Sequence, residues 1–327
     1  MVFCFGDTPF QIPDLTGKVA MVTGANTGMG YVIAEQLALN GAKVWMGARS
    51  EGKAKEAIEK FHADHEKTTK KGDIIWLPLD LTSPTDVMDS VKSLLSQTDR
   101  LHILVNNAAR LAAPYELTKD GLETSVAINH IGHFTLTTAL LPLLRHTSQL
   151  PGSDIRVITV SSHLHNYMKT IKLSTKEDFN NTFSSNPASA DSILAQAKRY
   201  NFTKLLNVLF AAELQRRADQ DGIPLISISL HPGVVATGGA LERFPAVVKP
   251  MLEVFGKTPL QGAEAALVAA TSLEVRTNEE KYKGAYLAPG GKLARASEAG
   301  RDEKLAKQLW ELSEKTVKDI LEVKGSE

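Results

Sequence analysis

The stretch Thr23-Gly24-Ala25-Asn26-Thr27-Gly28-Met29-Gly30 follows a short apolar run and precedes a helix-forming segment at residues 31–40. An apolar run, a glycine-rich turn and a helical pattern in this order are typical of a strand that leads into a helix. Glycines at such a turn let the backbone approach a phosphate, and the first N–H groups of the helix are free to donate. The stretch therefore predicts a dinucleotide site, although a tight turn without a ligand uses the same glycines. The candidate residues are Gly24, Asn26, Thr27, Gly28, Met29 and Gly30.

The alternation of strand and helix continues along the chain. We expect strands at residues 18–23, 43–48, 74–79, 101–105, 155–160, 224–230 and 285–288. We expect helices at residues 31–40, 51–65, 85–96, 121–145, 200–217 and 305–321. Strands that are apolar on both faces and alternate with helices form parallel sheets covered by helices on both sides. The predicted fold is α/β: a single doubly wound Rossmann domain over residues 1–327, with a seven-stranded parallel sheet.

Four segments lie outside this alternation or end it. We expect residues 1–15 to form a polar leader and residues 300–327 to carry an amphipathic C-terminal helix. Residues 163–199 and 238–257 are long irregular stretches, and ordered loops of such length in compact domains are usually functional. Both contain apolar side chains, so we expect them to border a mostly apolar pocket on the substrate side. Covering a sheet edge or a dimer face is the alternative.

Composition and charge exclude several classes of protein. The 327 residues include 37 Lys and Arg and 37 Asp and Glu, and a net charge of zero argues against nucleic acid as a partner held by bulk electrostatics. The single cysteine, Cys4, excludes an intrachain disulfide. No stretch approaches the roughly 18 apolar residues of a membrane span, so we expect a cytoplasmic protein.

The ends of the second and third strands carry residues that suit a nucleotide. An acidic residue after the second strand holds the ribose of NAD, whereas an arginine complements the 2′-phosphate of NADP. Arg49 and then Ser50 stand at this position, so the sequence favours NADP(H) over NAD(H); an ordinary surface arginine is the alternative. Asp80 and Leu81 end the third strand, where an Asp suits the adenine amino group and a Leu suits the ring.

Later strands supply candidates for the chemistry. Asn107 and Ala108 follow the fourth strand at the carboxyl edge of the sheet, where open α/β folds bind ligands; a capped loop uses Asn in the same way. Ser162 ends the fifth strand. Tyr200 and Lys204 face one side of a helix, so we expect the ammonium to lower the phenol pKa, which is about 10 when unperturbed. Such a tyrosine can exchange a proton with an alcohol near neutral pH. A coincidence of two surface residues is the alternative for a lone match of this spacing.

Taken in order, six motifs resemble the short-chain dehydrogenase/reductase family. They are TGANTGMG, NNAA, Asn129 within INHIGHF, the serine pair that ends in Ser162, YNFTK from Tyr200, and HPGVVAT from His231. The similarity runs from about residue 15 to about residue 321 and is greatest to the branch of retinol-dehydrogenase-like and WW-domain-oxidoreductase-like enzymes. It implies an oxidoreductase that interconverts an alcohol and a carbonyl by hydride transfer.

The resemblance also implies a role for each site residue. Tyr200 would be the general acid/base, and Lys204 would lower its pKa and bind the nicotinamide ribose. Ser162 would bind the substrate oxygen, and Asn129 would hold a water that extends the proton relay. The remaining cofactor contacts would be Pro232, Gly233, Val235 and Thr237 at the nicotinamide or the phosphates, and Asn107 and Ala108 near the adenosine ribose.

Three features depart from the family pattern. Ala109 replaces the usual glycine of NNAG and adds a methyl group to the floor of the site. Thr27 stands where many NADP-preferring members carry a basic residue, which leaves Arg49 to read the phosphate. Ser162 and Tyr200 lie further apart than is common, so we interpret residues 163–199 as an insertion beside the substrate cleft.

The histidines near these motifs have structural explanations. His163 and His165 have no third ligand in view, so the sequence predicts no metal site. His130 and His133 lie on the helix of Asn129, and we expect them to pack or to contact backbone rather than to catalyse. His231 precedes a Pro-Gly pair and is expected to anchor that loop.

The sequence thus favours an NADP(H)-dependent enzyme that reduces a lipophilic or aromatic aldehyde or ketone. The alternatives are a ketoreductase of secondary metabolism acting on a bulky polyketide or terpenoid, and a non-catalytic NADP(H)-binding sensor. Intact Asn129, Ser162, Tyr200 and Lys204 favour the enzyme, because a sensor needs no general acid. The expected partner is a small carbonyl or alcohol substrate. Many family members form homodimers or homotetramers through the two helices that match those of Asn129 and Tyr200, which leaves the oligomer open.

Overall fold

The computed structural model describes residues 3–5, 8–69, 71–235 and 256–324 and contains a central eight-stranded sheet in the order β10-β9-β8-β7-β6-β3-β4-β5. The strands are β3 (Val19–Thr23), β4 (Lys43–Ala48), β5 (Asp73–Pro78), β6 (Ile103–Asn106), β7 (Ile155–Val160), β8 (Leu225–Leu230), β9 (Tyr286–Ala288) and β10 (Lys292–Ala294). The first seven are parallel, as predicted. β10 adds an eighth, antiparallel strand, because the short turn Pro289–Gly291 folds it back on β9.

The strand order reverses between β3 and β6, which pair in parallel. In open α/β sheets, ligands bind at such a switch point, outside the carboxyl ends of the strands. The turn after β3 carries the glycine-rich stretch, and the turn after β6 begins at Asn107. The topology therefore places these two motifs side by side at one edge of the sheet.

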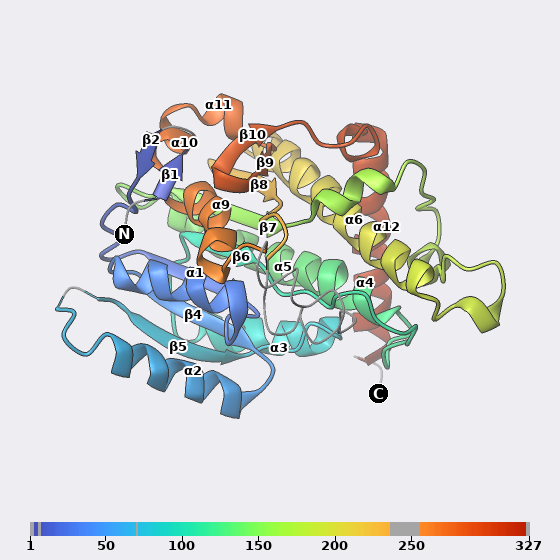
Figure 1. The fold of residues 1–327 in the computed structure, drawn as a ribbon, viewed down its shortest axis with the longest axis horizontal. Coiled ribbons are helices and arrows are strands. Elements are labelled where there is room, and N and C mark those ends of the chain that lie inside the picture. The colour runs from blue at the N-terminus through green and yellow to red at the C-terminus, as the bar shows by residue number, and fades with distance from the viewer. Residues whose placement is uncertain (1–2, 6–7, 70, 236–255, 325–327) are drawn as a thin grey trace.

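Two layers of helices cover the sheet, each over its own apolar cluster (Figure 1). On one face lie α1 (Gly28–Leu39), α2 (Glu51–Asp64) and α9 (Pro259–Thr271). On the other face lie α3 (Pro84–Leu95), α5 (Gly132–Ser148), α6 (Ile193–Gln220) and α12 (Glu303–Lys324). The short helices α4 (Thr124–Val126), α10 (Leu273–Thr277) and α11 (Glu279–Tyr282) complete the described α-helices. The doubly wound α/β prediction is confirmed.

The predicted amphipathic C-terminal helix is α12, and it packs on α5 and α6. The Trp310 ring stacks on Phe210 of α6, with centroids 5.9 Å apart, and meets Phe134 of α5 edge-on at 5.0 Å. Ser313 Oγ lies 2.8 Å from Nε2 of His130. The chain itself therefore covers one side of the two helices that we associated with oligomer formation, and the homodimer or homotetramer stays a prediction.

The irregular segments contain some regular structure. Within residues 1–15, β1 (Phe3–Phe5) and β2 (Thr8–Phe10) pair as an antiparallel ribbon rather than forming only a polar leader. The insertion at residues 163–199 contains the 3-10 helices His163–Tyr167, Lys176–Asn180 and Pro187–Ser189 before α6 begins. Most of the second stretch, residues 238–257, lies outside the described residues.

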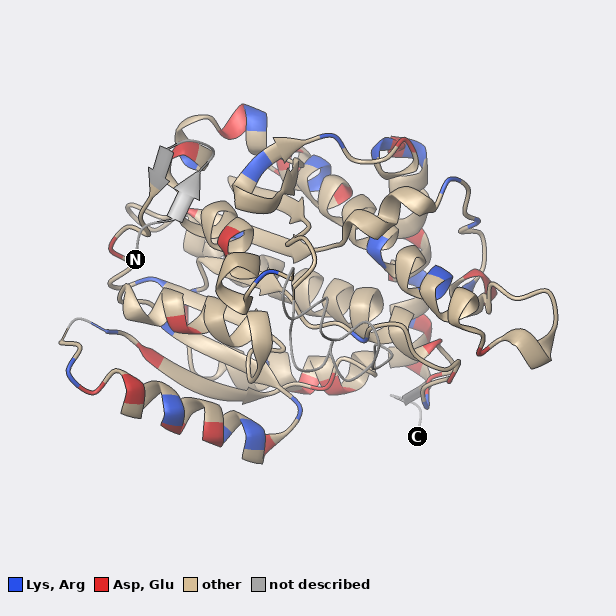
Figure 2. Ribbon diagram, in the orientation of Figure 1, with Lys and Arg blue, Asp and Glu red and all other residues tan. Residues whose placement is uncertain are grey.

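Charged residues of both signs occur along α2 (Figure 2). Among the helices that the structure describes, none combines the length and the apolar character needed to cross a membrane. The described ranges likewise contain no group of three or more His, Cys, Asp or Glu side chains arranged to hold a metal ion.

Candidate active site

The glycine-rich turn is packed tightly against the turn after β6. Gly24 has a φ of +63°, and a Cβ atom there would lie 3.0 Å from Cα of Ala108. A Cβ atom on Gly30 would collide with the Gly24 carbonyl oxygen and lie 2.5 Å from Nδ2 of Asn107. Only glycine fits these two positions, because the first needs a left-handed backbone and the second has no room for a side chain.

The N-terminus of α1 is open to an anion. Its N-cap, Thr27, has extended backbone dihedrals and makes no side-chain capping bond, and the first turn contains no acidic residue. Helix N–H groups that no side chain satisfies, together with the positive end of the helix dipole, suit a phosphate. The predicted residues from Gly24 to Gly30 thus form a cradle whose chemistry fits a dinucleotide pyrophosphate.

Thr23 fastens the two turns together through its hydroxyl and its carbonyl. Its Oγ1 accepts hydrogen bonds from the backbone N–H groups of Asn107 at 2.9 Å and Ala108 at 3.0 Å. Its carbonyl oxygen accepts a bond from Nδ2 of Asn107 at 2.9 Å. Asn107 and Ala108 therefore lie beside the glycine cradle. The side chain of Asn107 caps a loop of the protein itself, which is the alternative that the sequence left open.

Arg49 and Ser50 are exposed directly after β4. Ser50 is the N-cap of α2, and its Oγ accepts a bond from the N–H of Lys53 at 3.5 Å. In the part of the chain that the structure describes, no side chain pairs with the Arg49 guanidinium. This arginine is therefore accessible to an anion at the carboxyl end of its strand, where a 2′-phosphate is read in this fold.

Asp80 and Leu81 lie just beyond β5, which ends at Pro78 rather than at the predicted Leu79. An Asp80 carboxylate oxygen accepts a bond from the N–H of Thr82 at 2.9 Å, so the loop holds the carboxylate in place. Leu81 is buried in the apolar cluster between the sheet and α5. Its side chain thus serves the core, and its expected packing on an adenine ring stays a prediction.

Tyr200 on α6 lies beside Ser162 and Lys204. The Tyr200 hydroxyl hydrogen bonds to Ser162, which follows β7 and caps the helix His163–Tyr167. Nζ of Lys204 lies 5.5 Å from the centre of the Tyr200 ring and donates to the Val160 carbonyl at 3.0 Å. Residues separated by the whole insertion thus meet at the carboxyl end of one strand, as the motifs predicted.

The electrostatics of this group differ from the sequence expectation. Burial raises the pKa of Tyr200 to about 12, and only its hydrogen bond with Ser162 acts in the opposite direction. Burial also lowers the pKa of Lys204 to about 7. In this arrangement Lys204 does not lower the Tyr200 pKa as expected, because the low-dielectric surroundings disfavour the charged forms of both groups.

Asn129 lies in a π-helical turn, Ala127–Ile131, that joins α4 to α5. Its Oδ1 accepts a bond from the N–H of Arg110 at 2.7 Å, and its Nδ2 donates to the Arg110 carbonyl at 3.0 Å and to Oγ1 of Thr203 at 2.9 Å. Oγ1 of Thr203 in turn donates to the Tyr200 carbonyl at 2.8 Å. The two side-chain N–H donors of Asn129 are thus used within the protein, and the expected water stays a prediction.

The loop after β8 meets the glycine cradle at α9. Val235 pairs with Lys257 in an isolated parallel bridge. A Cβ atom on Gly262 of α9 would lie 2.6 Å from a Val235 methyl group and 3.4 Å from the Met29 sulfur. Three of the predicted cofactor residues in this loop are half-buried: Pro232, Gly233 and Val235. The fourth, Thr237, lies outside the described residues.

His165 joins Ser162 to the chain segment at Ser297 through its two ring nitrogens. Its Nδ1 lies 2.7 Å from the Ser162 carbonyl oxygen, and its Nε2 accepts a bond from the N–H of Ser297 at 3.1 Å. The His231 ring stacks on Tyr286 with centroids 5.7 Å apart. Both histidines therefore anchor loops, as the sequence suggested for His231.

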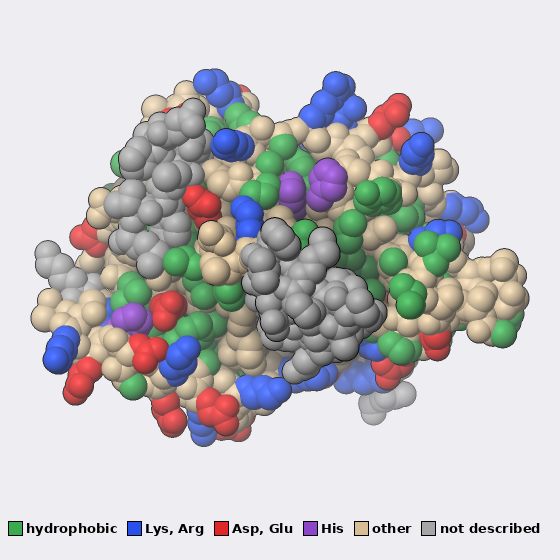
Figure 3. Space-filling model, viewed as in Figure 1, with side chains coloured by type: hydrophobic (Ala, Val, Ile, Leu, Met, Phe, Trp, Pro, Cys, Tyr) green, Lys and Arg blue, Asp and Glu red, His purple; other side chains and the backbone are tan. Residues whose placement is uncertain are grey.

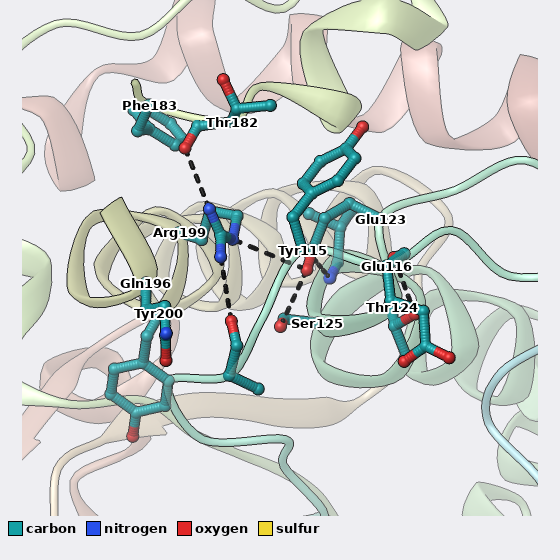
Figure 4. Close-up of polar contacts among 12 residues, drawn as sticks. Tyr115, Glu116, Glu123, Thr124, Ser125, Thr182, Phe183, Gln196, Arg199 and Tyr200 are labelled. Atoms are coloured by element: carbon teal, nitrogen blue, oxygen red, sulfur yellow. Dashed lines mark hydrogen bonds and ion pairs between the residues drawn. The ribbon is translucent and has the colours of Figure 1, made fainter. Parts of the chain in front are cut away.

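Arg199, which precedes Tyr200, is buried at 2% exposure and holds three loops (Figure 4). Its guanidinium donates to the carbonyls of Ala113 at 2.9 Å, Thr182 at 3.0 Å and Ala190 at 2.7 Å. Nε lies 3.9 Å from Oε1 of the buried Glu123. In Figure 4 the Tyr200 ring points away from this guanidinium, so one helical turn carries a structural arginine and the candidate acid.

Sequence reasoning missed Arg199, Thr203 and Thr23 as parts of the site. Each is adjacent to or within a motif, but each acts through backbone groups that are distant along the chain. Position next to a motif is the only sequence signal, and it does not say which backbone group the side chain reaches.

Figure 3 shows the face of the molecule seen in Figure 1, and its charged side chains gather mostly towards the edges. Hydrophobic and histidine side chains are visible nearer the middle of this face, next to the residues that are not described.

Comparisons with known proteins agree with this geometry. Residues 18–173 match the family model for short chain dehydrogenases. The chain is 45% identical over 318 residues to a short chain dehydrogenase/reductase from Colletotrichum higginsianum, covering 96% of this chain and 79% of the relative. It is 33% identical over 314 residues to human retinol dehydrogenase 14, covering 91% of this chain and 85% of the relative.

Solved structures share the fold. A crystal structure of an uncharacterised protein from Mycobacterium paratuberculosis has a TM-score of 0.69 and 29% identity, covering 97% of this chain and 98% of that chain. A short chain dehydrogenase from Shigella flexneri, solved in complex with NADP, has a TM-score of 0.62 and 20% identity, covering 86% of this chain and 100% of that chain. By its sequence relatives and its fold, this chain belongs to the short-chain dehydrogenase/reductase family, with a retinol-dehydrogenase-like relationship.

Proposed function

We propose that this protein catalyses the NADPH-dependent reduction of a lipophilic or aromatic aldehyde or ketone to an alcohol. The observation that carries the proposal is the meeting of Tyr200, Ser162 and Lys204 at the carboxyl end of β7, on the sheet edge that carries the glycine cradle. A proton donor, a hydrogen-bonding partner for the substrate oxygen and a cation are the groups that carbonyl reduction needs.

The residues present fit a bound NADP(H). The turn from Gly24 to Gly30 and the open N-terminus of α1 would hold the pyrophosphate. Arg49 would hold the 2′-phosphate, and Lys204 would bind the nicotinamide ribose hydroxyls. When bound, the reduced nicotinamide supplies the hydride that reaches the carbonyl carbon.

The chain's own residues then handle the oxygen of the substrate. The Ser162 hydroxyl orients this oxygen, and Tyr200 gives it a proton. The raised pKa of Tyr200 keeps the phenol protonated near neutral pH, which is the form that reduction requires. The phenolate left behind is stabilised by the Ser162 hydroxyl and by Lys204 in its charged form. Oxidation of an alcohol would instead need the phenolate at the start.

The preference for a lipophilic substrate has support from the surroundings of the site. Large apolar side chains are exposed on the segments next to Ser162, Tyr200 and Pro232. They are Leu164, Tyr167, Ile193, Leu194 and Val234. Exposed apolar groups that gather near one site are typical of a binding surface for apolar ligands. The name of the human relative, retinol dehydrogenase 14, also refers to a lipophilic alcohol.

The experiment that tests the proposal is a fluorescence titration of the purified protein with NADPH and with NADH. It is followed by nicotinamide absorbance measurements with retinal, medium-chain aldehydes and bulky cyclic ketones. Tight NADPH binding with oxidation in the presence of a carbonyl supports the proposal, and the preferred carbonyl separates a general aldehyde reductase from a ketoreductase of bulky substrates. Tight binding without turnover on any carbonyl or alcohol would favour the sensor, and no binding of either nucleotide would contradict the proposal.

A further inference from the structure

The imidazole of His133, on α5, lies beneath the candidate site with both of its nitrogens engaged. The side chain is 1% exposed. Its Nδ1 lies 3.2 Å from the carbonyl oxygen of Asn129, and its Nε2 lies 2.8 Å from Oγ1 of Thr23. The reaction proposed above makes no use of this ring, which contacts one residue of the catalytic set, Asn129, and the residue that precedes the cofactor cradle, Thr23.

The direction of both hydrogen bonds follows from their partners. A carbonyl oxygen only accepts, so Nδ1 carries the hydrogen and donates to Asn129. A neutral imidazole has one N–H group, so Nε2 is the acceptor and the Thr23 hydroxyl is the donor. Burial lowers the pKa of His133 to about 4, which keeps the ring neutral near pH 7. The tautomer of His133 is therefore fixed.

This tautomer determines how the Thr23 hydroxyl is used. Two acceptors lie within reach of its single hydrogen, Nε2 of His133 at 2.8 Å and the Val105 carbonyl oxygen at 3.4 Å, and the shorter contact is the one to His133. The lone pairs of the hydroxyl then face the N–H groups of Asn107 at 2.9 Å and Ala108 at 3.0 Å. The turn that these two residues begin closes over the glycine cradle, where Ala108 contacts Gly24. His133 thus orients the one hydroxyl that joins the turn after β6 to the end of β3.

The other nitrogen acts on the π-helical turn. In this turn a backbone hydrogen bond joins residues five apart, from the N–H of Gly132 to the Ala127 carbonyl, whereas an α-helix joins residues four apart. His133 gives the Asn129 carbonyl a side-chain donor inside this wide turn. The same residue, Asn129, reaches the Tyr200 backbone through Thr203. One ring therefore bridges the cofactor cradle and the helix pair that carries Asn129 and Tyr200.

We propose that His133 is a positioning residue that couples cofactor binding to the placement of Asn129. Its Nε2 holds the cradle through Thr23, and its Nδ1 holds the π-helical turn. The inference rests on the proposed NADPH-dependent reaction.

Two substitutions of His133 separate the two hydrogen bonds. In His133→Asn the side-chain N–H group reaches the place of Nδ1, but no atom reaches the place of Nε2. In His133→Gln the terminal amide reaches the place of Nε2 and offers an acceptor to Thr23, but the donor to Asn129 is lost. We expect His133→Asn to raise the Kd for NADPH roughly five- to tenfold, the effect of one lost hydrogen bond, with the smaller change in kcat. We expect His133→Gln to lower kcat by a similar factor with the smaller change in Kd.

His130 provides the matched control. It lies on the same helical segment and is equally buried, but its Nε2 contacts Ser313 of α12. His130→Asn and His130→Gln should lower the free energy of unfolding and leave the Kd and kcat within about twofold of the wild type. A general loss of packing would affect both histidines alike, whereas coupling affects only His133.

Thr23→Val keeps the side-chain volume and removes the hydroxyl. If His133 acts through Thr23, adding His133→Asn to Thr23→Val should raise the Kd for NADPH no further. If the His133 variants do not fold, Thr23→Val still tests the proposal. A Kd for NADPH equal to that of the wild type would overturn the role of the Thr23 hydroxyl.

The outcomes for the two proposals are distinct. If the wild type binds NADPH and reduces a carbonyl but the His133 variants match it in Kd and kcat and lose only stability, the inference about His133 is wrong and the proposed function stands. Additive effects of Thr23→Val and His133→Asn would also overturn the coupling. If the wild type binds no nicotinamide nucleotide, the proposed function fails, and the coupling role of His133 fails with it.

Discussion

Nζ of Lys204 lies 5.5 Å from the centre of the Tyr200 ring, while its hydrogen bond goes to the carbonyl of Val160 at the end of β7. The lysine is thus anchored to the sheet, and this anchor keeps its amino group next to the tyrosine. Burial makes each group resist ionisation. The protonation of this pair makes stability depend on pH.

Lys204 should make the folded chain more stable as pH rises above 7. Its pKa is about 7 when folded, against about 10.4 for an exposed lysine, so between these values the unfolded chain binds one more proton. The free energy of unfolding should then rise by up to about 1.4 kcal/mol per pH unit, until Tyr200 begins to oppose it near about pH 10. Urea unfolding at about pH 7.5 and about pH 9 should show a smaller rise for Lys204→Met than for the wild type. An equal rise in both proteins would show that this lysine stays charged inside the fold.

Tyr200→Phe should abolish most of the turnover and keep cofactor affinity. The phenylalanine keeps the ring and removes the proton donor, so we expect kcat to fall by about a hundredfold to ten-thousandfold, with the Kd for NADPH unchanged. Steady-state kinetics and fluorescence titration measure the two quantities. Tyr282→Phe, on α11, is the control and should turn over substrate as the wild type does. Activity within tenfold of the wild type in Tyr200→Phe would remove this residue from the acid role.

Arg49→Asp should shift the preference from NADPH towards NADH. The carboxylate would repel a 2′-phosphate and accept hydrogen bonds from a ribose diol, so the ratio of kcat/KM for the two cofactors should fall at least about tenfold. Lys55→Asp, on the exposed face of α2, changes the net charge equally and is the control. An unchanged ratio in Arg49→Asp would show that another group reads the phosphate.

Gly30→Ala should weaken NADPH binding because the new methyl group would collide with the Gly24 carbonyl and the Asn107 side chain. We expect a loss of about 1–3 kcal/mol in the free energy of unfolding and a higher Kd for NADPH. Gly52→Ala is the control, since a Cβ atom there meets nothing within 4 Å. It lies in α2 and should stabilise the protein by about 0.5–1 kcal/mol. Equal free energies of unfolding for the two variants would show that the residues around Gly30 can move to make room for the methyl group without destabilising the fold.

Arg199→Met should destabilise the protein strongly. It leaves the Glu123 carboxylate buried without its cation and removes the donor from the carbonyls of Ala113, Thr182 and Ala190. We expect a loss of about 3–5 kcal/mol, measured by urea unfolding. Adding Glu123→Gln should recover part of this loss, because the amide is neutral and can still cap α4. A loss below about 1 kcal/mol in the single variant would show that the three loops hold without the arginine.

Local sequence patterns predict most of the sheet and its helices. β4 and β7 have the predicted bounds, because apolar runs flanked by turn residues define buried strands without reference to a partner. β10 and the ribbon of β1 and β2 have only three residues each, and their pairing depends on a neighbouring strand. The helix α9 carries no prediction because its alanine-rich sequence is buried on most sides and lacks an amphipathic contrast.

The candidate site was predictable as a set of motifs but not as a network. The order of the motifs indicates that Ser162, Tyr200 and Lys204 meet, and the structure places them together. The contacts of Arg199 and His133 join residues far apart in the chain, so no local pattern encodes them. The raised pKa of Tyr200 is likewise a property of burial, which depends on the packed fold rather than on the spacing to Lys204.

The π-helical turn Ala127–Ile131 has a consequence for how this helix can change. An α-helix turns about 100° per residue, so one extra residue in a wide turn rotates all that follows relative to all that precedes. The helical segments before and after this turn therefore differ in rotation about the axis. With this rotation, Asn129 faces Arg110 and Thr203, and the apolar side of α5 faces the core. Deleting one residue from this turn would remove the difference in rotation. Either Asn129 would then turn away from its partners or the apolar side of α5 would turn away from the core. The length of this segment is therefore as much a requirement of the site as the side chains that it carries.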